Sequence, residues 1–207
     1  MLSPWTPRRC PRSTCDDGVM THFGSSQTDG AEQIRAFFGA CSDRLTSTTH
    51  GPAATEGAAA LAWALARSTP LPFEPRWLEA LDSVPAVEAT PLGVLFVELA
   101  PLLPWIPTPR ADDGGTHLAL APLEQVRDMG DLTVGIMYVA PGRQYPLHHH
   151  SPHELYLTIA GHADWRFGGH DDFRSIGPDS TVYNRPGDLH SAIAGDTPLV
   201  AFYVLWN

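Results

Sequence analysis

The sequence contains no lysine: all 13 basic side chains among its 207 residues are arginines. Without lysine, neither Schiff-base catalysis nor a phosphate-binding loop of the Gly-Lys-Ser/Thr type is available. The arginines are outnumbered by 23 acidic residues, which gives a formal net charge of −10. A chain this acidic lacks the clustered positive charge that nucleic acids and anionic lipids attract. We therefore expect a protein that binds neither nucleic acid nor membranes.

Cysteine and long apolar runs are also scarce. The three cysteines all lie in the first fifth of the chain, without the spacing of a disulfide framework. Residues 1–19 carry three arginines but lack the apolar stretch of a secretory signal. The longest apolar run, residues 91–107, is interrupted by Glu98 and by internal prolines, so it is too short and broken to span a bilayer. These absences predict a cytoplasmic protein.

The first half of the chain has the apolar periodicity of helices. From residue 29 to about residue 105, apolar residues recur at helical spacing, and Asp29 is the expected N-cap of the first helix. Pro75 is expected in the first turn of a later helix. Two apolar stripes carry most of this signal: Ile34, Phe37, Phe38, Cys41 and Leu45, and then Leu92, Leu95, Phe96, Leu99, Leu102 and Leu103.

The second half has the pattern of short strands, which are rich in Val, Ile, Tyr and Thr and separated by Gly, Pro and Asp. We expect eight strands, over residues 116–121, 132–139, 145–150, 154–160, 163–167, 180–183, 191–194 and 199–206. So many closely spaced strands favour a β-sandwich or barrel. The prediction is a mainly β protein with residues 1–28 as a disordered leader or over-extended start, 29–110 as a helical subdomain and 111–207 as a β-barrel.

The residues that can carry chemistry lie in one segment, residues 142–161. Side chains at i and i+2 of a strand share a face, so His148 and His150 point the same way and His149 points to the other face. In the next strand, Glu154 and Tyr156 share one face, while the leucines between them belong to the apolar face. Two imidazoles and a carboxylate can therefore converge from adjacent strands.

His190 provides a fourth ligand further along the chain. Three imidazoles and one carboxylate suit one divalent transition metal ion, and these ligand types do not decide among Zn, Fe and Mn. A mixed set that leaves coordination positions open is typical of a catalytic site. The alternative is a histidine-rich surface hairpin that holds no metal. For His149, His153, His162 and His170 we expect positions facing solvent or behind the ligands.

This segment resembles the first motif of the cupin family, which consists of a glycine, a His-x-His pair, a glutamate and a second glycine. The matching positions are Gly142, His148, His150, Glu154 and Gly161. The second cupin motif is matched in part by Gly187 and His190, although Ala194 stands where the family has an asparagine. The resemblance implies a C-terminal cupin barrel, which is a double-stranded β-helix of the jelly-roll type.

The run from Tyr145 to Tyr156, together with His190 and a helical N-terminal part, is similar to the DddQ-like, cupin-type dimethylsulfoniopropionate lyases. The resemblance implies a metal-dependent carbon–sulfur lyase that cleaves a small molecule, dimethylsulfoniopropionate, into dimethyl sulfide and acrylate by β-elimination. A base must take the proton next to the carboxylate, and Tyr156 is our first candidate because it shares a face with Glu154. Tyr145 is the second candidate for catalysis and for substrate binding, provided that Pro146 resets its strand parity.

The sulfonium end of this substrate is a soft cation, which aromatic faces bind by cation–π attraction. Trp206, Tyr203, Trp165 and Tyr138 are the aromatic candidates, and we assign Trp206 to substrate binding. The sequence leaves open which strand faces line the barrel. Two other functions also remain open: an Fe-dependent cupin dioxygenase acting on a small carboxylate or thiol, and a non-catalytic ligand-binding cupin. An exposed barrel edge is compatible with a homodimer.

Overall fold

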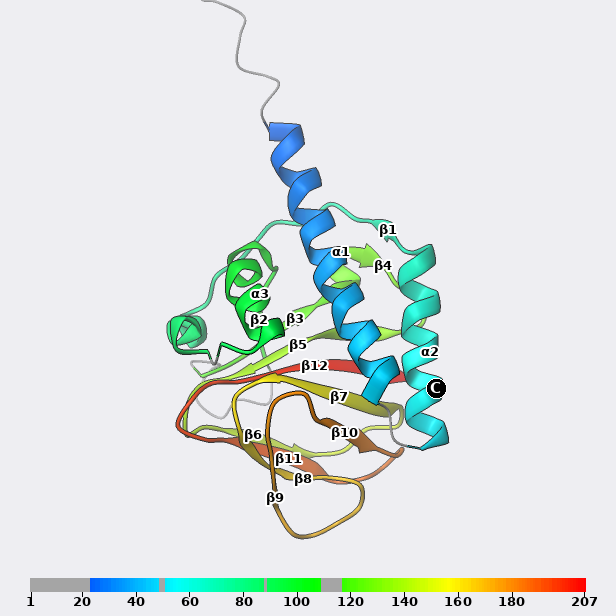
Figure 1. Cartoon of the computed structure of the whole chain (residues 1–207), viewed down its shortest axis with the longest axis vertical. Coiled ribbons are helices and arrows are strands. Elements are labelled where there is room, and N and C mark those ends of the chain that lie inside the picture. Colours follow the sequence, from blue (N-terminus) through cyan, green and yellow to red (C-terminus); the bar gives the residue numbers. More distant parts are fainter. Residues whose placement is uncertain (1–22, 49–50, 88, 109–116) are drawn as a thin grey trace, which may run out of the picture.

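The computed structural model describes residues 23–48, 51–87, 89–108 and 117–207, and it has three layers. Helices cover one face of a six-stranded sheet, and a four-stranded sheet lies against the other face (Figure 1). The order of the large sheet is β10-β7-β12-β5-β3-β2 and that of the small sheet is β6-β11-β8-β9. The expected mainly β fold, with a helical N-terminal part and a cupin barrel made of two antiparallel sheets, is confirmed.

In the described part of the chain, the outer layer consists of three α-helices: α1 (Phe23–Thr48), α2 (Pro52–Arg67) and α3 (Pro91–Leu99). The prediction of Asp29 as an N-cap is wrong because α1 already begins at Phe23, so Asp29 lies inside the helix. At α3 the cap is Thr90, whose hydroxyl oxygen accepts a hydrogen bond from Gly93 N at 2.9 Å. Of the leader expected over residues 1–28, residues 1–22 lie outside the described part of the chain, and residues 23–28 belong to α1.

Short 3₁₀ helices in the helical half are η1 (Glu79–Leu81), η2 (Val84–Ala86) and η3 (Ala100–Leu102), and η4 (Leu123–Gln125) lies in the β half. Pro75 precedes η1 by four residues and is not part of a first helical turn. Leu95 was expected in the apolar stripe of α3, but its side chain is 45% exposed, because this nine-residue helix buries a narrower face than the stripe suggested.

All eight expected strands are present, within two residues at each end. They are β3 (Leu118–Pro122), β5 (Thr133–Val139), β6 (Gln144–His148), β7 (His153–Ala160), β8 (Ala163–Arg166), β10 (Thr181–Asn184), β11 (His190–Ala194) and β12 (Leu199–Trp206). Sequence analysis missed four strands of two or three residues, which are too short to display a period of two: β1 (Thr69–Pro70), β2 (Ile106–Pro107), β4 (Arg127–Asp128) and β9 (Arg174–Ile176).

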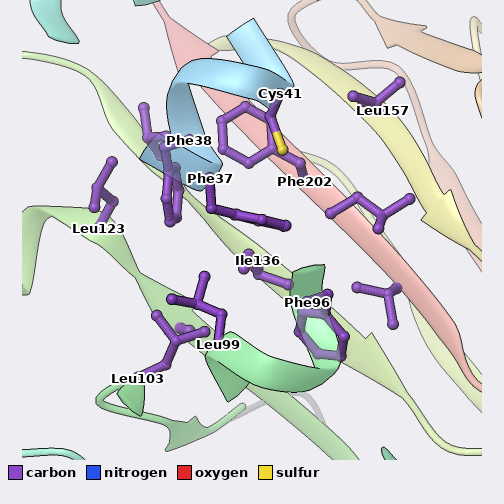
Figure 2. Packing of buried hydrophobic residues seen from close by; sticks show 14 of the residues in the cluster. Phe37, Phe38, Cys41, Phe96, Leu99, Leu103, Leu123, Ile136, Leu157 and Phe202 are labelled. Carbon is purple, nitrogen blue, oxygen red and sulfur yellow. The ribbon is translucent and has the colours of Figure 1, made fainter. Parts of the chain in front are cut away.

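The large apolar core lies between the helices and the six-stranded sheet. Phe37, Phe38 and Cys41 of α1 point onto the sheet, and Phe38 meets Phe202 of β12 edge-on, with ring centroids 5.1 Å apart (Figure 2). Burying each phenylalanine contributes roughly 1.5–3 kcal/mol. Burial also raises the pKa of the Cys41 thiol, which disfavours the reactive thiolate. This face of the sheet is therefore structural.

The opposite face of the same strands lines the barrel interior. In β7, Leu155 and Leu157 belong to the helix-facing core, whereas Tyr156 belongs to the cluster between the two sheets. In β12, Phe202 faces the helices and Tyr203 faces the interior. The period of two thus separates a packing face from the face that carries the polar and aromatic residues.

Helix α2 docks on the end of β12 through Gly57. A Cβ atom at Gly57 would lie 2.5 Å from two ring carbons of Trp206, a distance that side chains do not tolerate. The indole of Trp206 is 5% exposed and occupies the space that a side chain at residue 57 would need. The helix therefore approaches the sheet closely because residue 57 has no side chain.

We expect Gly57→Ala to lower the free energy of unfolding by about 1–3 kcal/mol, since overpacking would displace the Trp206 ring. In an unhindered helix the same change stabilises by roughly 0.5–1 kcal/mol. Gly39→Ala in α1 is the matched control, because no neighbouring atom lies within 4 Å of the added Cβ. Denaturant unfolding should move in opposite directions for the two variants, and stabilisation by both would contradict the packing argument.

Candidate metal centre

The register between β6 and β11 brings two histidines together at the mouth of the barrel. His190 is paired with His148, and Ala192 is paired with Tyr145. Between these two pairs, the single residue Ser191 of β11 lies opposite Pro146 and Leu147 of β6, so β6 carries one extra residue. Because of this bulge, Tyr145 joins the interior cluster although its spacing from His148 is odd. The parity reset expected at Pro146 is confirmed.

All three predicted histidine ligands have the same orientation. The Nδ1 atom of His148 contacts Pro146 O at 2.9 Å, that of His150 contacts Pro152 O at 3.1 Å, and that of His190 contacts Asp188 O at 2.9 Å. A carbonyl oxygen only accepts hydrogen bonds, so each Nδ1 must carry the proton. In its neutral form each ring then has its lone pair on Nε2, which is the arrangement that metal-binding histidines require.

These imidazoles converge on one point. One ring nitrogen from each of His148, His150 and His190 lies within 4.8 Å of the other two. Glu154 closes the group, because its Oε2 lies 3.2 Å from His150 Nε2 and 3.0 Å from His190 Nε2. The structure thus brings the three predicted histidines together and places the predicted Glu154 against two of them.

The carboxylate of Glu154 is buried in its charged form. Burial alone raises the pKa of Glu154, but in the metal-free protein His150 and His190 donate to the carboxylate and carry positive charge when their Nε2 atoms are protonated, and this outweighs burial and lowers the pKa to about 2. Asn184 Nδ2 also donates to Glu154 Oε2 at 3.2 Å. Once the three Nε2 atoms lose their protons to a metal, the ionised carboxylate and the three imidazole lone pairs form a donor set that fits one divalent transition metal ion.

Two tyrosines lie beside this group, inside the barrel. Tyr145 contacts His148 edge-on, with ring centroids 4.9 Å apart, and Tyr156 follows Glu154 on the inner face of β7. Burial and the nearby charge of Glu154 raise the pKa of Tyr156 well above its usual value, so the neutral phenol is favoured in the protein without metal. Both predicted catalytic tyrosines therefore lie beside a predicted ligand, Tyr145 against His148 and Tyr156 beside Glu154.

The interior wall continues with two more aromatic rings. Trp165 lies 5.0 Å and Tyr203 lies 6.4 Å from the ring of Tyr156, measured between centroids. Two buried polar atoms on this wall, Trp165 Nε1 and Thr158 Oγ1, make no hydrogen bond within the described part of the chain. Burying such groups without partners is unfavourable, which indicates a polar partner such as water or a ligand.

The structure does not bring Trp206 to this site. Its ring lies on the helix-facing side of β12 and stacks on His153 at a centroid distance of 5.3 Å. Tyr138 is on that side as well, where its hydroxyl lies 2.5 Å from Ser83 Oγ. Of the four aromatic candidates for the sulfonium group, Tyr203 and Trp165 are the two that face the interior.

The other histidines behave as expected for residues that are not ligands. His149, His162 and His170 are exposed, and His153 is half-buried with Nδ1 at 2.6 Å from Tyr183 Oη. Asn184 is the site residue that sequence analysis missed. It contacts Glu154 only because β10 pairs with β7 in that register, which no local pattern reveals.

Comparison with known proteins relates the barrel to one enzyme family. Residues 117–201 match the family described as dimethylsulfoniopropionate (DMSP) lyase. The chain is 35% identical over 76 residues to DMSP lyase DddQ of Ruegeria pomeroyi, and this match spans 37% of each chain. The matched part is thus little more than a third of that relative's length.

The structural likeness extends further than the sequence match. The crystal structure of DMSP lyase DddQ from Ruegeria pomeroyi superposes with a TM-score of 0.67 at 22% identity, covering 86% of this chain and 92% of that one. A chain from the crystal structures of the DMSP lyases RdDddP and RnDddQII gives 0.65 at 17% identity, covering 89% and 93%. At these identities the superpositions establish a common fold for the helical and barrel parts together.

No described helix is both long and apolar enough to traverse a bilayer.

Proposed function

We propose that this chain, whose barrel matches the DMSP lyase family model over residues 117–201, is a metal-dependent carbon–sulfur lyase that converts DMSP to dimethyl sulfide and acrylate. The observation that carries the proposal is the convergence of three imidazole Nε2 atoms and the Glu154 carboxylate beside two buried tyrosines. The metal ion would be held by His148, His150, Glu154 and His190, and Zn, Fe and Mn all suit these ligands.

The barrel interior is suited to a small zwitterion. DMSP carries a carboxylate at one end and a dimethylsulfonium group at the other. The rings of Tyr145, Tyr156, Trp165 and Tyr203 face the interior and present π surfaces to a soft cation. The indole N–H of Trp165 is buried and has no hydrogen-bond partner among the described residues, so it is available to donate to a bound polar group.

The reaction needs one base and little acid. Tyr156 takes the proton from the carbon next to the carboxylate, the electrons of that C–H bond form the C=C bond, and the C–S bond breaks with its pair remaining on sulfur. The sulfonium leaves as neutral dimethyl sulfide, so no residue has to protonate it, and the proton remains on Tyr156. When bound, a divalent cation supplies Lewis-acid stabilisation of negative charge on the substrate carboxylate and on the phenolate.

Sealed vials provide the direct test. Purified protein incubated with Mn, Fe or Zn and with DMSP should release dimethyl sulfide into the headspace and leave one equivalent of acrylate in solution. The same assay under nitrogen should give the same rate, because β-elimination consumes no oxygen. A rate that depends on oxygen would favour the dioxygenase alternative, and no release with any of the three metals would refute the proposed substrate.

A further inference from the structure

Asn184 connects the candidate metal centre to a surface loop. Its side chain is fully buried at the end of β10, where Nδ2 donates to Glu154 Oε2 at 3.2 Å. On its other side, Oδ1 accepts a hydrogen bond from Gly168 N at 3.2 Å. Gly168 lies in the connection between β8 and β9, residues 167–173, which we call loop 167–173.

The two hydrogen bonds fix the orientation of the amide. Gly168 N–H can only donate, so the oxygen of Asn184 must face the loop and the NH₂ group must face the carboxylate. The hydrogen bond from the Asn184 NH₂ group to Glu154 Oε2 restrains rotation of the carboxylate about the last bond of the Glu154 side chain. Glu154 Oε2 is thereby held between the Nε2 atoms of His150 and His190, at 3.2 and 3.0 Å.

The same loop is tied to a second ligand by a separate path. Arg185 Nη2 donates to Gly168 O at 3.5 Å, and Arg185 Nε donates to Asp188 Oδ2 at 3.2 Å. The backbone oxygen of Asp188 accepts from His190 Nδ1 at 2.9 Å. Asn184 thus connects Glu154 to loop 167–173, and Arg185 and Asp188 connect the same loop to His190.

We propose that Asn184 is a positioning residue that orients Glu154 and couples the conformation of loop 167–173 to the metal centre. This inference rests on the proposed metal-dependent function. Hydrogen-bond partners behind metal ligands typically contribute 10–100-fold to metal affinity, because they fix the ligand in its binding geometry. Asn184 is the only described side chain that bridges a predicted ligand and this loop directly.

Two substitutions separate the two bonds. Asn184→Asp keeps an oxygen for Gly168 N–H but replaces the donor to Glu154 with a second negative oxygen, whereas Asn184→Ala removes both bonds. In a competition titration with a chromogenic chelator, we expect both variants to bind Zn or Mn about 10–100-fold more weakly than the native protein. Amide hydrogen exchange at Gly168 should accelerate in Asn184→Ala and stay near native in Asn184→Asp. Thr181→Ala, on the same strand but on its outward face, is the control and should change neither readout.

The readouts do not depend on turnover. Native metal affinity in Asn184→Asp would overturn the positioning role, and native exchange at Gly168 in Asn184→Ala would overturn the coupling to the loop. A general loss of structure would instead lower the melting temperature of the metal-free variants, which is measured alongside. If the native protein binds metal but releases no dimethyl sulfide, the proposed substrate fails while the Asn184 comparison still decides this inference.

Discussion

Tyr156→Phe is expected to abolish the release of dimethyl sulfide while leaving metal binding unchanged. The hydroxyl is the only group that this substitution removes, and the ring keeps its place against Trp165 in the barrel interior. A positioned general base typically contributes 10²–10⁴-fold to a rate, and a loss of that size should appear in kcat. Headspace chromatography measures the rate, and metal analysis of the same sample shows whether the site still loads.

The choice of Tyr156 over Tyr145 follows from its position on β7. Tyr156 is two residues from Glu154 on the same strand face, and the charge of that carboxylate adds to burial in raising the pKa of the Tyr156 phenol. Tyr145 enters the interior from the opposite sheet, beyond the bulge of β6. We expect Tyr145→Phe to weaken substrate binding, seen as a higher KM, and to retain a measurable kcat. The reverse result, with Tyr145→Phe inactive and Tyr156→Phe active, would exchange the two roles.

The raised pKa of Tyr156 gives this prediction a second readout. Burial, and then the charge of Glu154, favour the neutral phenol, and a neutral phenol is a poor base. Positive charge is therefore needed near its oxygen before it can act. Titrating metal into the native protein should produce the ultraviolet difference absorbance of tyrosinate, and Tyr156→Phe should lack this signal.

A control for buried hydroxyls comes from the other face of the sheet. Tyr138 is fully buried in the helix-facing core and its hydroxyl is bonded to Ser83. Tyr138→Phe should cost about 1 kcal/mol of stability, the usual net value of such a hydrogen bond, with no change in rate. If it lost activity as completely as Tyr156→Phe, the effect would come from disturbance of the fold.

Much of this architecture could be predicted because its signals are local. Strand parity alone separated His148 and His150 from His149, and the structure has the first two inside and the last exposed. Parity also grouped Phe202 with Trp206, but it could not say which face meets the barrel. That choice depends on where α1 and α2 dock, which explains why Trp206 was assigned to the substrate although it packs on Gly57.

What could not be predicted depends on long-range register and on backbone groups. The contact of Asn184 with Glu154 joins residues 30 positions apart through the pairing of β10 with β7. The three Nδ1 atoms contact the backbone oxygens of Pro146, Pro152 and Asp188. Every residue has such an oxygen, so the sequence does not indicate which ones will accept these hydrogen bonds. These are the features that turn four suitable residues into an oriented donor set.

His190→Ala is the second large effect that we expect, with the loss of metal and activity together. His190 is 1% exposed, and its ring centroid lies 4.0 Å from that of His148 and 5.0 Å from that of His150. Its removal leaves three of the four donors and takes away the Nε2 atom closest to Glu154 Oε2. Metal affinity should fall by more than the 10–100-fold typical of a lost outer hydrogen bond. Because metal assistance provides several kcal/mol, the rate should fall by about 10³-fold or more.

His149→Ala is the matched control, because it lies between two predicted ligands and is exposed on the opposite face. A histidine-rich surface hairpin would bind metal loosely through whichever imidazoles are nearest, so the two variants would then lose similar affinity. A barrel site distinguishes them: His149→Ala should match the native protein in metal affinity, in headspace rate and in the thermal stabilisation that added metal produces.

Chelator treatment of the native protein should reproduce the His190→Ala phenotype, and added Mn, Fe or Zn should restore the native protein alone. Restoration of His190→Ala to the native rate by excess metal would instead mean that the other three donors suffice for the reaction.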